Sequence, residues 1–377
     1  MSAMEISSNY GVYEKRFENV FNKFNTNLAS SIDIGASFAV YSNGKLLVDL
    51  AGGFKNKDKT ELWTPTTTVC VHSTGKGIVA MCLAILIEKG MLNLDSKVSE
   101  YWPEFGASNK TDIKVRTLLS HQEGLYDWKE KMTESDFLNW NYCTELLAAQ
   151  ETLHMPGTKI CYHAKSIGFL VGELIKRISG KSVGEFLKEE LVDPLNVSCT
   201  IGTPISYHNE IAELISSPDL NAAFNDRDKI DKYTMSAFLN PGNRTRTANT
   251  EEFKVAEIPA LNCHSNSVSL AKLYDYFFNS DLVSNSTLES ITSIEIKGND
   301  QVMKRPMQWS PVGFSIGGGK LFGTSSRSFG HTGWGGSMAF TDPENNLSIA
   351  YTMNLLTGSM LGDNRALELV AETYKSL

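Results

Sequence analysis

The chain has 377 residues, of which 41% are hydrophobic, so it can bury a large core and is too long for a small binding module. A formal net charge of -8, without any long lysine or arginine run, excludes a basic surface for nucleic acid or for an anionic membrane. We therefore expect neither nucleic acid nor a membrane as a partner.

The sequence also indicates where the protein resides. Residues 1–26 contain no positively charged start and no continuous apolar stretch, so they do not resemble a secretory signal. No segment approaches the roughly 18 consecutive apolar residues that a membrane-spanning helix needs. Six cysteines are scattered without a Cys-x-x-Cys pair, which is typical of reduced, buried thiols. These features predict a cytoplasmic protein without a cofactor, and they leave its oligomeric state open.

The amino-terminal part is expected to form a helix followed by a hairpin. Apolar residues recur every three or four positions over 13–28, which is the spacing of an amphipathic helix. Two strand-like runs, 35–41 and 45–50, then flank Ser42-Asn43-Gly44. This tripeptide favours a tight turn because asparagine and glycine tolerate positive φ.

The middle of the chain has mainly helical periodicity, and the carboxy-terminal end again favours strands. Polar residues without periodicity over 206–250 indicate long loops. The runs 337–341 and 347–354 flank a second hairpin turn, and 362–377 predicts a closing helix. In the middle, helices are predicted over 78–88, 136–149, 166–178, 183–191 and 268–278.

These elements predict an α+β fold. Because sequential strands usually pair, both chain ends should build one antiparallel sheet flanked by terminal helices, with a mainly helical lobe inserted between them. We expect a single catalytic domain of two interleaved lobes, an α/β lobe over about 1–70 and 305–377 and a helical lobe over about 73–304. A cleft between the sheet edge and the helical lobe is the expected place for a site.

Ser73 and Lys76 form a Ser-x-x-Lys pattern directly before the apolar segment 78–90. A serine hydroxyl is a poor nucleophile at neutral pH, and a desolvated lysine one helical turn later can serve as its base. Ser73 would also stand at a helix amino end, where free N–H groups favour a developing oxyanion. The pattern recurs at Ser42, in the hairpin turn, and at Ser269, on a helix face expected to meet water.

Tyr162, which follows the loop Pro156-Gly157, is the second candidate base. A free phenol titrates near pH 10, so a phenolate at pH 7 costs about 4 kcal/mol, which only adjacent positive charge such as Lys76 could offset. Taken alone, this tyrosine is more often a packed aromatic residue. Together with Ser73 and Lys76, it completes a nucleophile with two candidate bases.

A glycine-rich segment near the carboxy terminus supplies candidate substrate-binding residues. Glycines weaken a strand but let a ligand lie against its backbone, and an N–H there can complete an oxyanion hole. The alternative interpretation is a glycine-rich β-bulge without function. The candidates are His331, Thr332, Gly333 and Trp334, of which Trp334 can stack on an apolar acyl or alcohol group.

In combination, these motifs resemble those of the serine β-lactamase and penicillin-binding-protein superfamily. Tyr101-Trp102-Pro103 and Trp334-Gly335-Gly336 are similar to its class C-like branch, the family VIII carboxylesterases. The resemblance implies that Ser73 is acylated, that Lys76 and Tyr162 share its proton, and that a β-edge binds the substrate. The motifs that carry it, in the family's order, are Ser73-x-x-Lys76, Leu118-Leu119-Ser120-His121, Tyr162, Pro194-Leu195-Asn196 and His331-Thr332-Gly333.

Two departures from the β-lactamase pattern favour esters over β-lactams. Tyr162-His163-Ala164 stands where β-lactamases of this class usually have Tyr-x-Asn, which removes an amide donor. His331 replaces the lysine of Lys-Thr-Gly, and a histidine is mostly neutral at pH 7, so the site lacks a permanent cation for the β-lactam carboxylate. The alignment with the Lys-Thr-Gly motif stays open, because Trp334-Gly335-Gly336 can align with this motif in place of His331-Thr332-Gly333.

The predicted activity is hydrolysis of small carboxylic esters through an acyl-enzyme on Ser73, with acyl transfer to alcohols as a further capacity. The alternatives are a β-lactamase or D-amino-acid peptidase or amidase of the same fold, and an inactive scaffold or binding protein.

Other catalytic chemistries fit the sequence less well. Gly313-Phe314-Ser315-Ile316-Gly317 matches the nucleophile elbow of α/β-hydrolases, but no acidic residue lies between Ser315 and His331, so we expect a strand beside the site. The histidines lack metal-site spacing, and Cys161 has no base beside it, so no metal and no thiol nucleophile are expected.

Overall fold

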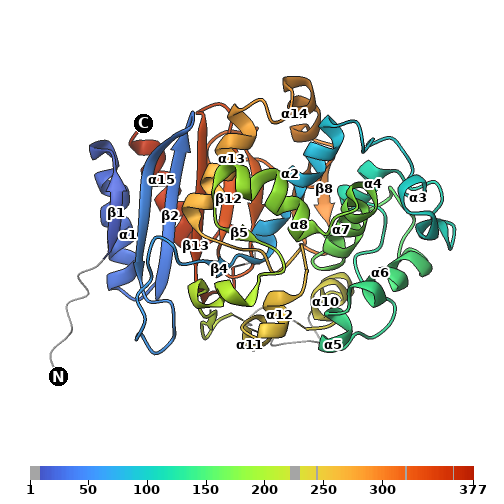
Figure 1. The fold of residues 1–377 in the computed structure, drawn as a ribbon, viewed down its shortest axis with the longest axis horizontal. Coiled ribbons are helices and arrows are strands. Elements are labelled where there is room, and N and C mark those ends of the chain that lie inside the picture. The colour runs from blue at the N-terminus through green and yellow to red at the C-terminus, as the bar shows by residue number, and fades with distance from the viewer. Residues whose placement is uncertain (1–8, 221–229, 243–244, 319–320, 360) are drawn as a thin grey trace.

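The computed structural model describes residues 9–220, 230–242, 245–318, 321–359 and 361–377. Within these residues, nine strands form one antiparallel sheet to which both ends of the chain contribute (Figure 1). In spatial order the strands are β1 (Tyr10–Tyr13), β3 (Lys45–Gly53), β2 (Gly35–Ser42), β13 (Leu347–Met353), β12 (Met338–Asp342), β11 (Phe329–Thr332), β10 (Ser315–Ile316), β9 (Arg305–Trp309) and β8 (Ile296–Asp300).

The two chain ends meet inside the sheet, where β2 pairs with β13 from Ala36 opposite Met353 to Tyr41 opposite Ser348. Every residue of β13 is buried, because helices cover both faces of the sheet. Helices α1 (Glu18–Ala29) and α15 (Asn364–Lys375) pack on one face, and α13 (Ser267–Asn279) packs on the other (Figure 1). The predicted α+β fold, with a sheet built from both ends and flanked by terminal helices, is confirmed.

Most of the other helices gather beside the sheet, at the end away from β1 (Figure 1). Five short strands connect this helical region to the rest of the protein. One small sheet contains β4 (Val69–Cys70), β7 (His264–Ser265) and β5 (Cys199–Thr200), and another contains β6 (Ile215–Ser216) and β14 (Leu355–Leu356). The helices are α2 (Gly75–Glu88), α3 (Val98–Tyr101), α4 (Val115–Leu119), α5 (Glu134–Phe137), α6 (Trp140–Ala149), α7 (Ser166–Ser179), α8 (Val183–Leu187), α9 (Asp193–Leu195), α10 (Lys232–Leu239), α11 (Thr245–Ala248), α12 (Glu251–Val255) and α14 (Asn285–Thr292).

Three expectations from the sequence need correction. The helix predicted over 136–149 is two helices, because the Asn139 side chain accepts from Tyr142 N and starts α6 anew. The helix predicted over 183–191 leaves α-helical geometry after α8 and continues as a π-helical turn. The segment 206–250, predicted as loops, contains α10 and α11, while 221–229 and 243–244 lie outside the described residues.

The division into two lobes stays a prediction, but two elements assigned to the helical lobe lie with the sheet. α13 packs on β2, β12 and β13, which buries its apolar residues Leu270, Leu273 and Phe277. β8 extends the sheet back to Ile296, which lies before the expected boundary at about 305. Long-range packing therefore assigns both elements to the sheet.

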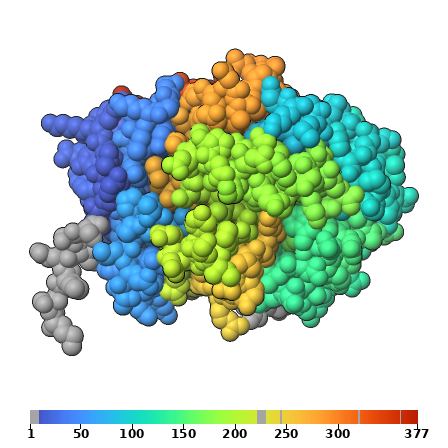
Figure 2. All heavy atoms as spheres, in the orientation of Figure 1, coloured from blue at the N-terminus to red at the C-terminus, as the bar shows by residue number. Residues whose placement is uncertain are grey.

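The face shown in Figure 2 is assembled from distant parts of the sequence. The amino-terminal part (blue) and the segment near 100–150 (cyan to green) lie at its opposite ends, and later segments (yellow-green to orange) fill the area between them. In the described part of the chain, no helix combines the length and hydrophobicity needed to cross a membrane. All six cysteines are buried and unbridged.

The close approach of α2 to α13 depends on glycine at position 77. The sequence suggests that Gly77 leaves room for a backbone or a substrate, but the Tyr274 ring fills this space. A Cβ at Gly77 would lie 1.9 Å from Tyr274 Oη. Tyr274 is fully buried, and its hydroxyl has no hydrogen-bond partner within the described residues.

We predict that Gly77→Ala lowers the free energy of unfolding by about 2 kcal/mol, because overpacking outweighs the better helix propensity of alanine. Adding Tyr274→Phe removes the clashing oxygen and should restore more than half of this loss. Urea denaturation of both single variants and the double variant measures the effect. A double variant no more stable than Gly77→Ala would contradict the packing described here.

Candidate active site

Ser73 lies in a 3-10 turn, His72–Thr74, that leads into α2, and Lys76 follows within the first turn of that helix. Lys76 Nζ is 2.8 Å from Ser73 Oγ, 2.9 Å from the Ala164 carbonyl oxygen and 3.0 Å from the Ala260 carbonyl oxygen. The structure therefore places this hydroxyl and this amine in direct contact.

The surroundings of Lys76 favour its neutral form. Burial lowers the pKa of Lys76 well below its ordinary value. A neutral amine has two N–H groups and one lone pair. The carbonyls of Ala164 and Ala260 can accept both N–H groups, which leaves the lone pair directed at the Ser73 hydroxyl. This arrangement suits proton transfer from Ser73 to Lys76.

Tyr162 belongs to the same cluster. Its ring centre lies 5.1 Å from Lys76 Nζ, and its phenol hydrogen-bonds to the Ser73 side chain. The ring stacks on Trp309 with centroids 5.5 Å apart and meets the edge of His121 at 5.1 Å. Burial raises the pKa of Tyr162 in spite of the Ser73 hydrogen bond. The structure thus favours a neutral phenol and not the phenolate considered from the sequence.

Strand β11 places His331 and Thr332 beside this cluster. With Ser73 and Tyr162 they line an open pocket, which we call the nucleophile pocket. Its empty space, including the solvent at its mouth, is about 400 Å³. Burial, aided by nearby Lys76, lowers the pKa of His331 to about 3, so its ring is neutral. His331 Nδ1 lies 2.7 Å from the Thr332 carbonyl oxygen, which assigns the ring proton to Nδ1.

The remaining walls of the nucleophile pocket are mostly apolar, and sequence reasoning missed nearly all of them. Met307 and Trp309 are buried along β9 with the partly exposed Gln308 between them, and this alternation of apolar and polar residues is the signal that could have identified the strand. Ser315 lies on β10, so its segment is a strand beside the site, as expected. The further lining residues are Phe238, Met303 and Leu361.

The segment after β11 packs directly against the turn that carries Ser73. Gly333 N donates to the Ser337 carbonyl oxygen at 2.7 Å, and a Cβ on Gly333 would lie 2.3 Å from the Val71 carbonyl oxygen. Trp334 N–H, in contrast, donates to no backbone acceptor within the described residues. Gly333 is thus needed for close packing, and Trp334 presents the available N–H.

A buried ion-pair network holds the turn at Gly335, which has a left-handed φ of 88°. Arg365 Nη2 donates to the Gly335 carbonyl oxygen at 2.7 Å, and its guanidinium also binds Asp33 and Asp363. His331 and Thr332 therefore lie in the strand beside Ser73, Gly333 directly follows this strand, and Gly335 belongs to the turn beyond it.

The two other Ser-x-x-Lys patterns do not bring a hydroxyl and an amine together. Ser42 ends β2 in the hairpin, as expected. The second pair was expected on a wet surface, but Ser269 Oγ accepts from Ser198 N at 2.9 Å, and Lys272 Nζ donates to the Leu195 carbonyl oxygen at 2.8 Å. Both side chains therefore hold a neighbouring loop.

Comparisons with known proteins identify the family of the chain and its fold. A model of the family described as Beta-lactamase matches residues 24–372. The "Esterase/beta-lactamase LipL" of Mycobacterium tuberculosis (strain ATCC 25618 / H37Rv) is 28% identical over 369 residues, which are 95% of this chain and 85% of LipL.

Two solved structures superpose on nearly the whole chain. A family VIII carboxylesterase gives a TM-score of 0.91 at 30% identity, covering 98% of this chain and 100% of that chain. A penicillin-binding protein homolog from Caulobacter crescentus gives a TM-score of 0.90 with the same identity and coverage. The family match spans both the sheet and the inserted helices, and the chain therefore belongs to the Beta-lactamase family as a serine hydrolase of that fold.

Proposed function

We propose that the protein hydrolyses small, neutral carboxylic esters through an acyl-enzyme on Ser73. The observation that carries this proposal is the 2.8 Å contact between Ser73 Oγ and the desolvated amine of Lys76. This contact opens on a pocket lined, within the described residues, by no lysine or arginine.

In the acylation step, Lys76 takes the proton of Ser73 while Oγ attacks the ester carbonyl carbon. The carbonyl oxygen becomes an oxyanion, which the N–H groups of Ser73 and Trp334 stabilise. When the bond to the alcohol breaks, Tyr162 donates its proton to the departing alkoxide, and Lys76 returns the proton it gained to Tyr162. The products are the free alcohol and an acyl group bonded to Ser73.

In the deacylation step, water attacks the acyl carbon and loses its proton to the same groups. Ser73 Oγ leaves and is reprotonated, which releases the carboxylic acid. An alcohol that enters in place of water would yield a new ester. The apolar walls of the nucleophile pocket, among them Trp309 and Met307, support this acyl transfer because they favour an alcohol over water.

Three features support an ester over a β-lactam substrate. His331 is neutral and offers no fixed charge to a carboxylate. The His163 ring turns inward, with Nε2 2.6 Å from Glu123 Oε1, so it adds no donor to the pocket. Ala164 has no side-chain amide. β-Lactam hydrolysis is the second candidate, because LipL is named for both activities.

We predict that a fluorophosphonate probe labels the protein at Ser73 and that Ser73→Ala abolishes both labelling and turnover of p-nitrophenyl acetate. Intact-mass spectrometry of the labelled protein locates the adduct. Labelling that persists in Ser73→Ala would contradict the assigned nucleophile. A larger kcat/KM for a chromogenic cephalosporin than for the ester would contradict the ester assignment.

The pH dependence follows from the shifted pKa values. Only the neutral amine of Lys76 can accept the Ser73 proton, so kcat/KM should rise with pH through a pKa well below 10.5. It should then stay level past pH 10, because the raised pKa of Tyr162 keeps the phenol protonated.

Lys76→Arg should lower kcat/KM by about 1,000-fold, since a guanidinium does not deprotonate in this range. Initial rates of p-nitrophenyl acetate hydrolysis across the stable pH range measure both effects. A profile that begins to rise only near pH 10 would show that Lys76 is an ordinary ammonium.

A further inference from the structure

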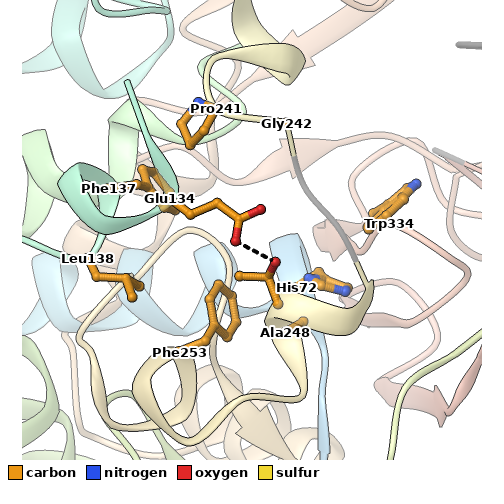
Figure 3. Close-up of a pocket in the computed structure, with 10 residues that line it drawn as sticks. His72, Glu134, Phe137, Leu138, Pro241, Gly242, Ala248, Phe253 and Trp334 are labelled. Carbon is orange, nitrogen blue, oxygen red and sulfur yellow. Dashed lines mark hydrogen bonds between the residues drawn. The ribbon is translucent and has the colours of Figure 1, made fainter. Parts of the chain in front are cut away.

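A second pocket borders the turn that carries the nucleophile. It shares Trp334 with the nucleophile pocket, and this side chain lies between the two. Figure 3 shows His72, Trp334 and several apolar side chains around this second pocket, together with Glu134, which accepts a hydrogen bond from Thr247 at 3.0 Å. We call it the His72 pocket; its apolar walls include Phe137, Leu138, Ala248 and Phe253.

His72 brings an unused hydrogen-bond acceptor to this pocket. The side chain is 2% exposed, and its Nε2 has no hydrogen-bond partner within the described residues. Cys70 Sγ donates its single hydrogen to the Leu261 carbonyl oxygen at 3.1 Å. The His72 ring also donates a hydrogen bond to the Leu261 backbone. Because Nε2 has no partner among the described residues, this bond uses a proton on Nδ1, which leaves a lone pair on Nε2.

Two further observations indicate that a ligand donates a hydrogen bond to His72 Nε2. Burial lowers the pKa of His72 to about 4, so the ring is neutral at pH 7 and cannot donate from Nε2. A buried acceptor without a donor is destabilising, and a hydroxyl or amino group of a ligand would remove this cost. His72 also holds a φ of 47°, a strained conformation for a residue with a side chain, directly before Ser73.

The proton route decides which half of an ester enters each pocket. This step rests on the proposed function, in which Tyr162 protonates the departing alcohol. Tyr162 lines the nucleophile pocket and not the His72 pocket, so the alcohol half lies in the nucleophile pocket. The acyl half of the ester then extends past Trp334 into the His72 pocket.

We infer that the His72 pocket binds the acyl group of the substrate and that His72 Nε2 accepts a hydrogen bond from a hydroxyl or amino group on it. The substrate class is therefore a short acyl ester that carries a hydrogen-bond donor, either a hydroxyacyl or an aminoacyl ester.

The far wall of the His72 pocket is held firmly, which limits the acyl group to a short one. Lys165 is buried, and its Nζ donates to the carbonyl oxygens of Phe238, at 3.0 Å, and of Pro241. The Asn240 side chain donates to the Trp128 carbonyl oxygen at 3.0 Å. Because Phe238 lines the nucleophile pocket and Pro241 lines the His72 pocket, the anchored end of α10 and the residues directly after it set the width of both.

Two matched variants test which half of the ester each pocket holds. Ala248→Val narrows the His72 pocket, and Ser315→Val narrows the nucleophile pocket. Ala248→Val should lower the kcat/KM ratio of phenyl butyrate to phenyl acetate about tenfold, whereas Ser315→Val should lower the ratio of 2-naphthyl acetate to phenyl acetate by a similar factor. The reverse pattern, or unchanged ratios in Ala248→Val, would overturn the assignment.

The donor requirement is tested with esters of one alcohol, namely phenyl butyrate, 3-hydroxybutyrate and 3-aminobutyrate. The wild type should prefer the hydroxyl or the amino ester to the plain one by about tenfold in kcat/KM, which corresponds to about 1.4 kcal/mol. Whichever of the two is faster identifies the donor. In His72→Asn, which tolerates positive φ but is shorter, this preference should fall to about one.

The possible failures of these experiments are distinguishable. Equal kcat/KM for all three esters in the wild type would overturn the role of His72, even if His72→Asn does not fold. Circular dichroism and fluorophosphonate labelling show whether each variant is folded and keeps its nucleophile. Absence of turnover with every ester would instead contradict the proposed function.

Discussion

The desolvation of Lys76 is the constraint on which the rest of the site depends. Its amine is buried against α2 and the carbonyls of Ala164 and Ala260, and burial alone lowers its pKa. An ammonium here would lose much of its hydration, whereas a neutral amine satisfies both carbonyls and still faces Ser73. The lowered pKa of Lys76 therefore arises from three separate chain segments that exclude water together.

The same physical effect acts on three further groups around Ser73, namely His72, Tyr162 and His331. Burial lowers the pKa values of His72 and His331 and raises that of Tyr162, so each group moves toward its neutral form. The nucleophile pocket does not compensate the desolvation of an ion, because no lysine, arginine or carboxylate lines it within the described residues. It suits a neutral ester, whose charge appears only in the transition state, where the N–H groups of Ser73 and Trp334 can meet it.

Local sequence patterns predicted much of the fold and most of the candidate site residues. The hairpin at Asn43-Gly44 and the amphipathic helix of α13 are local features, and the family's motif order identified Ser73, Lys76 and Tyr162. Strand β9 escaped detection because Pro306 interrupts a short run, although its partners β8 and β10 are the neighbouring strands in the chain.

The walls of both pockets were not predictable for a related reason. Phe238 and Leu361 reach the nucleophile pocket from segments with no motif of their own, and only tertiary packing brings them there. The sequence places His72 next to Ser73, but its left-handed φ and its unused Nε2 emerge only in three dimensions. Likewise, the phenol or phenolate form of Tyr162 depends on how deeply the ring is buried.

The ionisation of Lys76 in the free protein tests this account most directly. Protein labelled with ¹³C-lysine can be titrated by nuclear magnetic resonance, with Lys76→Arg used to assign the Lys76 side-chain signal. The account predicts that this signal shifts at a pH well below the ordinary lysine value of 10.5, apart from the signals of the surface lysines. A Lys76 signal that titrates together with the surface lysines would contradict it.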